Sequence, residues 1–253
     1  GNRYFYYTSC VMNCVFDCEY CYLKGMYPSA NIVVFVNLED IFAEVERILE
    51  SHPLYLCVSY DTDLLALEQI IGYVREWCDF AAAHEDLKIE IRTKCANHFY
   101  TRNVMPSPGV IYAFTLSPQR IIEAFEHHTS SLAERLSCAA ELIRAGCPVR
   151  LCFDPMICLP DWEQCYAEML EQVFGTIDPE KLVDVSVGTF RISQDYLKNM
   201  RKQEPGSAVV WFPFQKENGY CHYPDALMER MESFLTERLE TRISGEKIFR
   251  GRV

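Results

Sequence analysis

The chain has 253 residues, of which 49% are hydrophobic and 24% charged, and this balance excludes a disordered, collagen-like or low-complexity chain. The formal net charge of −12 means that the chain as a whole is not attracted to polyanions, so a nucleic-acid partner would need a local basic surface. Apolar runs such as residues 32–36 are far shorter than a membrane-spanning helix, so we expect a soluble protein with no membrane partner.

Strand-like and helix-like segments alternate along most of the chain. The strand-like segments are residues 3–8, 31–36, 54–59, 87–93, 109–116, 148–153 and 182–189. The helix-like segments are residues 38–51, 64–83, 118–145, 161–174 and 193–202. This alternation indicates a parallel sheet covered by helices, an α/β fold. Six βα units fit the length better than eight, so we expect a partial (βα)6 barrel of the TIM type.

The C-terminal segment breaks this alternation. Residues 208–223 have an aromatic strand pattern with a turn at Asn218-Gly219, which predicts a hairpin, and residues 224–239 predict a last helix. We therefore expect a barrel over residues 1–205 and a hairpin and helix packed on it over residues 206–253.

The chain contains 13 cysteines, an odd number, and no signal peptide is visible. These features favour reduced thiols and a cytoplasmic protein, with most cysteines packed in the core. The chain begins at Gly1 and not at a methionine, which is typical of a cleaved tag or of a chain that lacks upstream sequence.

Three of the cysteines, Cys14, Cys18 and Cys21, form a C-x3-C-x2-C loop directly after the first predicted strand. On a parallel barrel such a loop lies at the face where active sites gather. Three thiolates on a short loop can bind three irons of a [4Fe-4S] cluster and leave the fourth iron open. Zinc is an alternative that needs a fourth ligand, for which Cys10 is the candidate. A redox sensor that uses Cys18 and Cys21 as vicinal thiols is another.

This spacing, with an aromatic residue before the last cysteine, resembles the radical S-adenosylmethionine (SAM) superfamily. Residues 18–23 (CEYCYL) and 36–41 (VNLEDI) are similar to the spore photoproduct lyase family within it. Weaker similarity continues through residues 61–68, 92–94, 114–117, 154–156 and 188–191, so the resemblance covers about residues 4–240. It implies a partial barrel of the radical SAM type, a [4Fe-4S] cluster, bound SAM, and an electron donor such as ferredoxin or flavodoxin.

The resemblance also implies roles for individual residues. Cys14, Cys18 and Cys21 would bind the cluster. The residues that would contact SAM are Tyr20 beside the adenine, Thr62, Asp63, Lys94 at the carboxylate, Thr115 and Ser117.

Enzymes of this family repair a thymine photoproduct in DNA by carbon–carbon bond cleavage, and a cysteine returns a hydrogen atom to the product. The aligned position of that cysteine is Tyr60 in this chain, and Cys57, three residues earlier, needs a local shift to serve. Tyr20 and Tyr22 match two tyrosines that relay hydrogen in the family. Cys152 and Cys158 are alternative donors beside the fifth barrel strand.

The substrate stays open at this point: thymine-lesion DNA, another nucleotide, a peptide or a small molecule. A zinc-binding structural or interaction protein is the alternative of another class. Aromatic residues of the predicted hairpin can stack on a flipped base, although packing in the core is the favoured interpretation; they are Trp211, Phe212, Phe214 and Tyr220. Two basic groups are candidates for a nucleic-acid surface, although solvated helix faces are more ordinary: Arg191, Lys198, Arg201 and Lys202; and Arg242, Lys247, Arg250 and Arg252.

Overall fold

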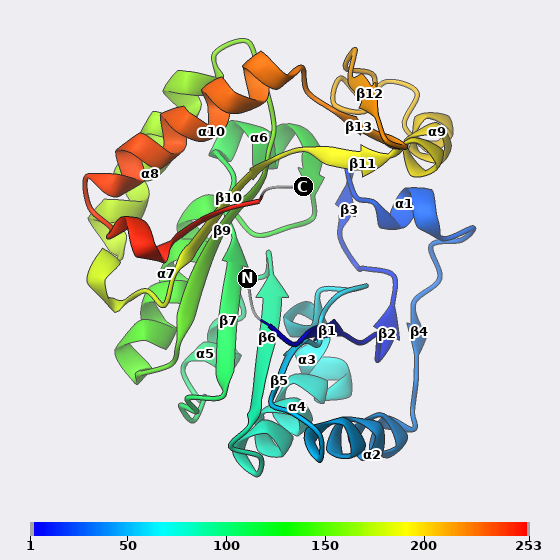
Figure 1. The fold of residues 1–253 in the computed structure, drawn as a ribbon, viewed down its shortest axis with the longest axis vertical. Coiled ribbons are helices and arrows are strands. Elements are labelled where there is room, and N and C mark those ends of the chain that lie inside the picture. Colours follow the sequence, from blue (N-terminus) through cyan, green and yellow to red (C-terminus); the bar gives the residue numbers. More distant parts are fainter. Residues whose placement is uncertain (1–2, 252–253) are drawn as a thin grey trace.

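A seven-stranded sheet forms the centre of the molecule in the computed structural model, which describes residues 3–251 (Figure 1). All its neighbouring strands run parallel. Their order is β1 (Phe5–Tyr7), β5 (Leu54–Cys57), β6 (Leu87–Thr93), β7 (Val110–Thr115), β9 (Val149–Met156), β10 (Val185–Thr189) and β14 (Ile248–Arg250). The sheet is a curled half-barrel, so the expected partial α/β barrel is confirmed.

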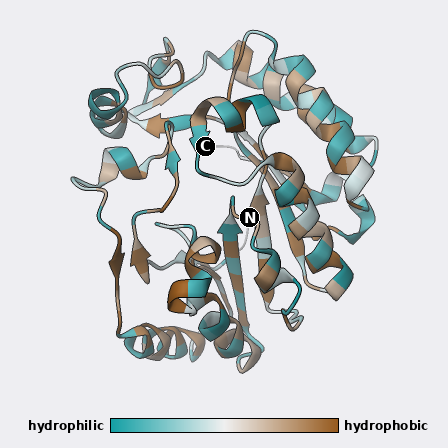
Figure 2. Ribbon diagram, turned by 180° about the vertical axis from the view of Figure 1, so that it is seen from behind, coloured by the Kyte–Doolittle hydropathy of each residue, from teal (hydrophilic) through white to brown (hydrophobic). Residues whose placement is uncertain are grey.

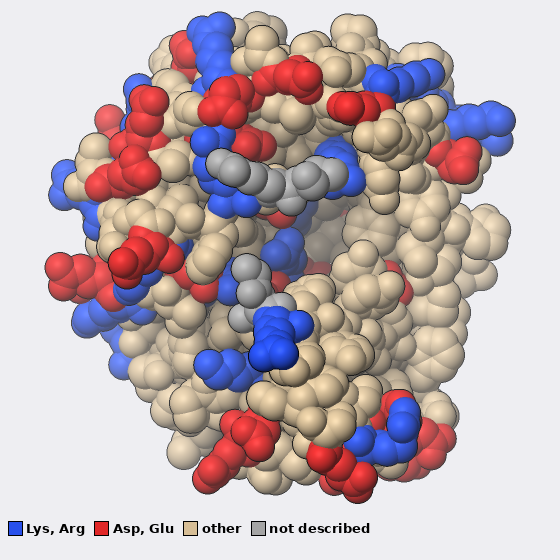
Figure 3. All heavy atoms as spheres, viewed as in Figure 1, with Lys and Arg blue, Asp and Glu red and all other residues tan. Residues whose placement is uncertain are grey.

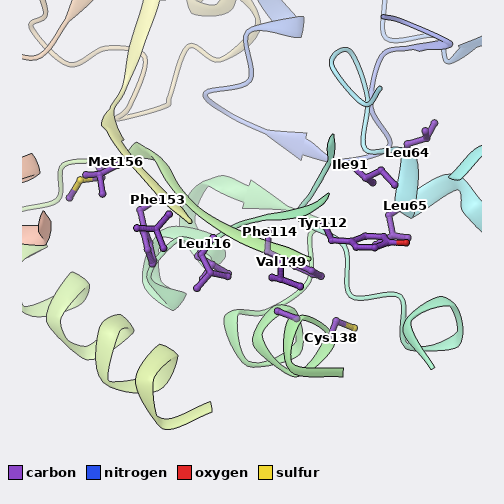
Figure 4. Packing of buried hydrophobic residues seen from close by; sticks show 14 of the residues in the cluster. Leu64, Leu65, Ile91, Tyr112, Phe114, Leu116, Cys138, Val149, Phe153 and Met156 are labelled. Carbon is purple, nitrogen blue, oxygen red and sulfur yellow. The ribbon is translucent and has the colours of Figure 1, made fainter. Parts of the chain in front are cut away.

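Helices cover the outer face of this sheet, and each carries both apolar and polar residues (Figure 2). They are α2 (Leu38–Leu49), α3 (Leu64–Ile71), α4 (Tyr73–Ala82), α5 (His98–Thr101), α6 (Gln119–Phe125), α7 (Leu132–Ala145), α8 (Trp162–Thr176) and α10 (Asp225–Glu240). Phe114 and Val149 pack between the sheet and α7, where Figure 4 shows them with Cys138. No helix in the described part of the chain is both long and apolar enough to cross a membrane.

Two of the predicted helices are each divided in the structure. The helix expected over residues 64–83 ends at Gly72, whose φ of +71° places it in the left-handed region that ends helices, so α3 and α4 are separate. The helix expected over residues 118–145 is interrupted by β8 (Glu126–His127). A capping box of Ser131 and Glu134 then begins α7.

The cysteine-rich segment after β1 is held at the carboxyl edge of the sheet by two small strand pairs. β2 (Val11–Met12) pairs with β4 (Val33–Val34), and β3 (Asp17–Cys18) pairs antiparallel with β8. A short helix, α1 (Leu23–Met26), follows. It packs against α9 (Gln194–Gln203), so this loop contacts segments that are far away in sequence.

The C-terminal region differs from the prediction in two ways. The hairpin is shorter than expected, because only β12 (Gln215–Glu217) and β13 (Tyr220–His222) are strands, and β11 (Arg191–Ser193) pairs with β13. The chain then returns through α10 to add β14 beside β10, a seventh strand that the prediction lacked. Two short 3-10 helices, Pro179–Lys181 and Gly245–Lys247, complete the elements. The division at residue 205 stays a prediction, and Arg252 lies outside the described residues.

Candidate functional site

A cavity of about 330 Å³ lies between the cysteine loop and the carboxyl ends of the sheet strands. Figure 3 shows this face of the molecule hollowed near its centre, with basic side chains in the hollow. The lining residues are Cys14, Phe16, Cys18, Tyr20, Cys21, Tyr22, Leu23, Ser59, Tyr60, Thr62, Asp63, Arg92, Thr93, Lys94, Thr115, Asp154, Pro155, Thr189, Phe190, Arg191 and Ile192. The three cysteines of the motif and most of the predicted SAM contacts are therefore brought together.

The three cysteines are presented to the cavity by a tight backbone. The backbone N–H of Cys21 donates to the carbonyl of Cys18 at 3.1 Å, and Cys18 itself is paired with Glu126 in the β3–β8 ladder. In the described part of the chain, the three Sγ atoms do not all lie within 4.8 Å of one another. Thiolates that share one tetrahedral zinc ion are separated by roughly 3.8 Å, given Zn–S bonds of about 2.3 Å. The spread of these thiols suits ligands of different metal atoms better than ligands of one ion.

Cys10, the candidate fourth zinc ligand, lies elsewhere. It is fully buried, its thiol faces the carbonyl of Val58 at 3.8 Å, and it does not line the cavity. Burial raises the pKa of Cys14 and of Cys18 to about 12. In the chain alone these thiols therefore keep their protons, and binding of a metal would release them.

A buried ionic network holds the cavity wall behind Cys18. Glu126 is fully buried and accepts hydrogen bonds from the hydroxyls of Tyr20 and Ser117 and from the Arg135 guanidinium, the last at 2.5 Å. The Lys94 amine lies 3.2 Å from the same carboxylate. Burial by itself would raise the pKa of Glu126, but the two cations outweigh it and lower the pKa to about 2. Glu126 is thus an anion whose charge is balanced inside the protein.

Lys94 links this network to the cavity. Its Nζ donates to the Tyr20 hydroxyl at 2.7 Å and lies 3.8 Å from Cys18 Sγ. Burial opposes its charge, but Cys18, Glu126 and Tyr20 outweigh that cost and hold the pKa of Lys94 well above its usual value. The cavity therefore contains one fixed cation beside the cysteine loop, which is suited to an anionic group such as a carboxylate.

Asp63 was predicted to contact SAM, and in the structure its carboxylate also holds two elements of the fold. Its carboxylate caps α3 by accepting from the backbone N–H of Ala66, and it also accepts from the Thr93 hydroxyl at 2.7 Å and the Lys94 N–H at 2.6 Å. These bonds position the end of β6. Asp63 lines the cavity, but three protein donors already use its oxygens.

The other predicted SAM contacts separate into two groups. Thr62 and Thr115 line the cavity, and the Thr62 hydroxyl oxygen is buried without a hydrogen-bond partner in the described part of the chain. Such an orphaned polar atom is costly unless a ligand satisfies it. Ser117 is buried but does not line the cavity, and its hydroxyl is used by Glu126.

Tyrosines form one side of the cavity. Tyr60 lines it, is 40% exposed, and its ring stacks on Tyr7 at 4.2 Å and lies 5.8 Å from the ring of Tyr22. The Tyr22 hydroxyl donates to the Tyr60 carbonyl at 2.5 Å and is 3.3 Å from Asp61. Asp61 also accepts a hydrogen bond from the Tyr27 hydroxyl at 2.9 Å, so one carboxylate contacts two tyrosine hydroxyls on this side of the cavity.

The predicted cysteine donors lie outside the cavity lining. Cys57 is buried at the end of β5, Cys152 is fully buried in β9, and Cys158 is half-buried beyond that strand. Within residues 3–251, the thiols that line the cavity are those of the cysteine loop alone.

Some aromatic residues of the C-terminal region pack in the core, and others are exposed to solvent. Phe212 and Phe214 pack against the core, as favoured, whereas Trp211 is 53% exposed and Tyr220 42% exposed. The Arg191 guanidinium lies 4.0 Å from the centre of the Tyr220 ring, at the cavity. A second groove on the outer side of α9 is mainly basic, with one acidic residue: its charged and aromatic lining residues are Asp195, Lys198, Arg201, Lys202, Trp211 and Lys216.

Sequence reasoning missed Glu126, Arg135 and Asp61 as residues that organise the site. Each is a charged side chain that the structure places at or near the interior, and two of them lie in segments with an apolar helical pattern. The detectable signal was a charged residue at a position where the pattern expects a buried one.

Comparison with known proteins identifies relatives of this arrangement. A family model described as spore photoproduct lyase matches residues 5–207. The spore photoproduct lyase of Clostridium acetobutylicum is 25% identical over 183 residues, which are 70% of this chain and 54% of that protein. That of Geobacillus sp. is 24% identical over 185 residues, 72% of this chain and 53% of that protein. The chain thus spans about half the length of these curated relatives.

Solved structures show the same fold. A spore photoproduct lyase double mutant with bound AdoMet and dinucleoside spore photoproduct has a TM-score of 0.82 at 19% identity, covering 95% of this chain and 74% of that one. Streptococcus suis SuiB bound to its precursor peptide SuiA has a TM-score of 0.67 at 10% identity, covering 98% of this chain and 48% of that one. At these identities the likeness concerns the fold.

Proposed function

Because this chain belongs to the spore photoproduct lyase family, we propose that it is a radical SAM enzyme whose reaction takes place in the cavity beside the cysteine loop. One observation carries the proposal. Three thiols, the half-buried Lys94 cation and Thr62, whose buried hydroxyl has no partner in the described residues, line one cavity at the carboxyl edge of the sheet. A zinc-binding structural protein would need neither the cation nor the orphaned hydroxyl.

Cys14, Cys18 and Cys21 would hold a [4Fe-4S] cluster, because all three line the cavity and three thiolates can bind three of its irons. The cluster and SAM, when both are bound, supply the one-electron chemistry that removes a hydrogen atom from a substrate. Lys94 would hold the SAM carboxylate as an ion pair, because its charge is fixed by Glu126 nearby. Thr62 and Thr115 would add hydrogen bonds, and Tyr20 would lie along the bound cofactor as a rigid wall.

Tyr60 is the residue that we assign as hydrogen donor to the product. It occupies the position of the family cysteine, lines the cavity, and its hydroxyl has no hydrogen-bond partner in the described residues. Donation breaks the phenolic O–H bond of Tyr60, forms a C–H bond on the product, and leaves a tyrosyl radical. Tyr22, whose ring centre lies 5.8 Å away, would return one hydrogen atom to Tyr60 and regain its own from 5′-deoxyadenosine. Cys57 stays the alternative donor, although it would first have to reach the cavity.

We assign a thymine photoproduct in DNA as the first substrate to test. A solved relative binds a dinucleoside spore photoproduct, as its description states. The cavity carries Arg92 and Arg191, and the basic groove on α9 follows directly after Arg191 in the chain. Such cations can contact phosphates on either side of a lesion. A local basic surface of this kind supports binding of DNA in spite of the overall negative charge.

A different substrate of the same chemistry is the second candidate. Tyr60 in place of a thiol is the observation that favours it, because a change of hydrogen donor changes which product radicals can be reduced. A peptide or small molecule would then occupy the cavity and contact Arg191 and Tyr220.

The test is anaerobic reconstitution with iron and sulfide, followed by SAM, dithionite and a synthetic spore-photoproduct dinucleotide. We expect a brown protein that forms 5′-deoxyadenosine and repaired dithymidine, both measured by mass spectrometry. Deoxyadenosine without repair would keep the radical chemistry and reject this substrate. A colourless protein that takes up zinc in the cysteine loop would overturn the proposal.

A further inference from the structure

A second cluster of ligand-type side chains lies away from the cavity, where α5 packs against α7 on the outer side of the sheet (Figure 1). It consists of His98 on α5 and Cys138 and Glu141 on α7. The imidazole nitrogen, the thiol sulfur and a carboxylate oxygen all lie within 4.8 Å of one another. None of these residues lines the cavity or takes part in the proposed reaction.

Two of the three donor atoms lie close to the third, which is a ring nitrogen of His98. His98 Nδ1 lies 3.0 Å from Glu141 Oε2 and 3.4 Å from Cys138 Sγ. A ring nitrogen carries either one hydrogen or one lone pair, so without a metal it satisfies only one of these two neighbours. Tetrahedral zinc with ordinary bond lengths would space a nitrogen from an oxygen or a sulfur by roughly 3.4–3.6 Å. The observed distances are within a few tenths of an ångström of that spacing.

The side chains around the cluster fix the Glu141 carboxylate by hydrogen bonds. Cys138 is fully buried, and Glu141 Oε1 accepts from the Arg102 guanidinium at 2.9 Å while Oε2 accepts from the Thr101 hydroxyl at 2.5 Å. These two hydrogen bonds hold the Glu141 carboxylate in one orientation, as contacts around a metal site do.

The sequence spacing is also that of a metal site. Cys138 and Glu141 are three residues apart on α7, which places them on one face of the helix. Cys95 precedes His98 by the same interval and is a free, half-buried thiol. Its thiol is not among the donor atoms that lie within 4.8 Å of one another, so it would have to move to supply a fourth ligand, and water is the alternative.

We propose that His98, Cys138 and Glu141 form a transition-metal site, for zinc in the first place, that joins α5 to α7. One thiolate, one imidazole and one carboxylate are a ligand set that zinc accepts. The site has a consequence for the cavity, because α5 begins four residues after Lys94 and α7 carries Arg135. A metal at this point would fix α7, which carries Arg135, against α5, the helix that begins shortly after Lys94, and both cations contact Glu126.

The experiment measures zinc and iron per chain in the reconstituted protein after dialysis against a mild chelator. We expect one zinc per chain in addition to iron. His98→Ala, Cys138→Ser and Glu141→Gln should each weaken zinc binding at least tenfold and leave the iron content unchanged. Cys95→Ser tests the fourth ligand: loss of zinc assigns Cys95, and retention assigns water, both within the proposal.

Two controls separate this site from the cysteine loop and from general loss of structure. Cys147→Ser is matched, since Cys147 is a buried thiol as Cys138 is, and it should keep zinc. The triple variant Cys14→Ala, Cys18→Ala, Cys21→Ala should lose iron but keep zinc. Zinc that disappears in the triple variant, or that survives in His98→Ala and Glu141→Gln, would overturn the proposal, whatever the outcome for the radical chemistry.

Cobalt reports directly on the ligands of the site. Co²⁺ added to the zinc-free triple variant should produce a thiolate-to-cobalt charge-transfer band and the visible bands of a tetrahedral ion. The same addition to the triple variant that also carries Cys138→Ser should give neither. A spectrum without thiolate character in the first protein would contradict the assignment of Cys138.

Discussion

The hydroxyl of Tyr20 donates a hydrogen bond to the carboxylate of Glu126, although 106 positions separate the two residues in sequence. This bond joins the cysteine loop to β8, the short strand between α6 and α7, and the β3–β8 ladder runs beside it. Lys94 and Arg135 complete the contacts around the carboxylate. The position of the loop thus depends on a buried charge that lies 106 residues further along the chain.

Glu126→Gln should destabilise the protein. The substitution leaves the Lys94 and Arg135 cations buried without their anion, and loss of one partner of a buried pair costs about 3–5 kcal/mol. Urea unfolding followed by circular dichroism measures the change. Glu123→Gln, on the exposed face of α6, is the control and should change the free energy of unfolding by less than about 0.5 kcal/mol.

Cys18→Ala should abolish iron binding after reconstitution, because one of three cluster ligands is lost. Cys10→Ser should keep iron, since Cys10 is buried away from the cavity. Iron analysis and the visible absorption spectrum report both results. Loss of metal from Cys10→Ser in a folded protein would revive the four-ligand zinc interpretation.

Thr62→Val should weaken SAM binding, because the buried hydroxyl has no partner in the protein and would be satisfied by the cofactor. One hydrogen bond contributes about 0.5–1.5 kcal/mol, so the dissociation constant should rise roughly two- to tenfold. Isothermal titration on the reconstituted protein measures this constant. Thr62→Ser keeps the hydroxyl and should bind as the original chain does; equal affinities for all three proteins would exclude the contact.

Tyr60→Phe should stop hydrogen return while leaving SAM cleavage intact, because the ring remains and only the O–H bond is lost. We expect 5′-deoxyadenosine to form and most of the repaired product to disappear. Tyr60→Cys should restore product, since a thiol gives up hydrogen readily. Tyr7→Phe is the matched control, because Tyr7 stacks on Tyr60 but does not line the cavity. Full repair by Tyr60→Phe would transfer the role to Cys57.

Ser131→Ala should lower the free energy of unfolding at neutral pH and should make this free energy depend less on pH in acid. The Ser131 hydroxyl and backbone lower the pKa of Glu134 below its ordinary value of 4.5. This contribution to stability is therefore present above pH 4.5 and is lost as the pH falls through the lower folded-state pKa. Removal of the N-cap should cost about 1 kcal/mol at neutral pH and less in acid, where the two proteins converge. Thermal unfolding between neutral and acidic pH measures the difference; a constant gap at every pH would contradict it.

Local patterns in the sequence determined much of this protein. The C-x3-C-x2-C spacing identified the cysteine loop because metal ligation by a short loop depends on residues that are neighbours in the chain. The alternation of apolar periods identified the α/β barrel for the same reason, since a strand or helix buries a face set by local periodicity. Lys94 and Thr62 were predicted from the resemblance to the family and not from local periodicity, and both line the cavity.

Only the tertiary structure decided the remainder, which depends on contacts between distant segments. Glu126 interrupts a predicted helix because β8 pairs with β3, an interaction that no local window contains. Tyr60, and not Cys57, faces the cavity because the end of β5 turns there. His98 meets Cys138 and Glu141 only after α5 packs on α7. Burial and long-range pairing override local propensity at such points, because their energies arise from partners that the local sequence does not specify.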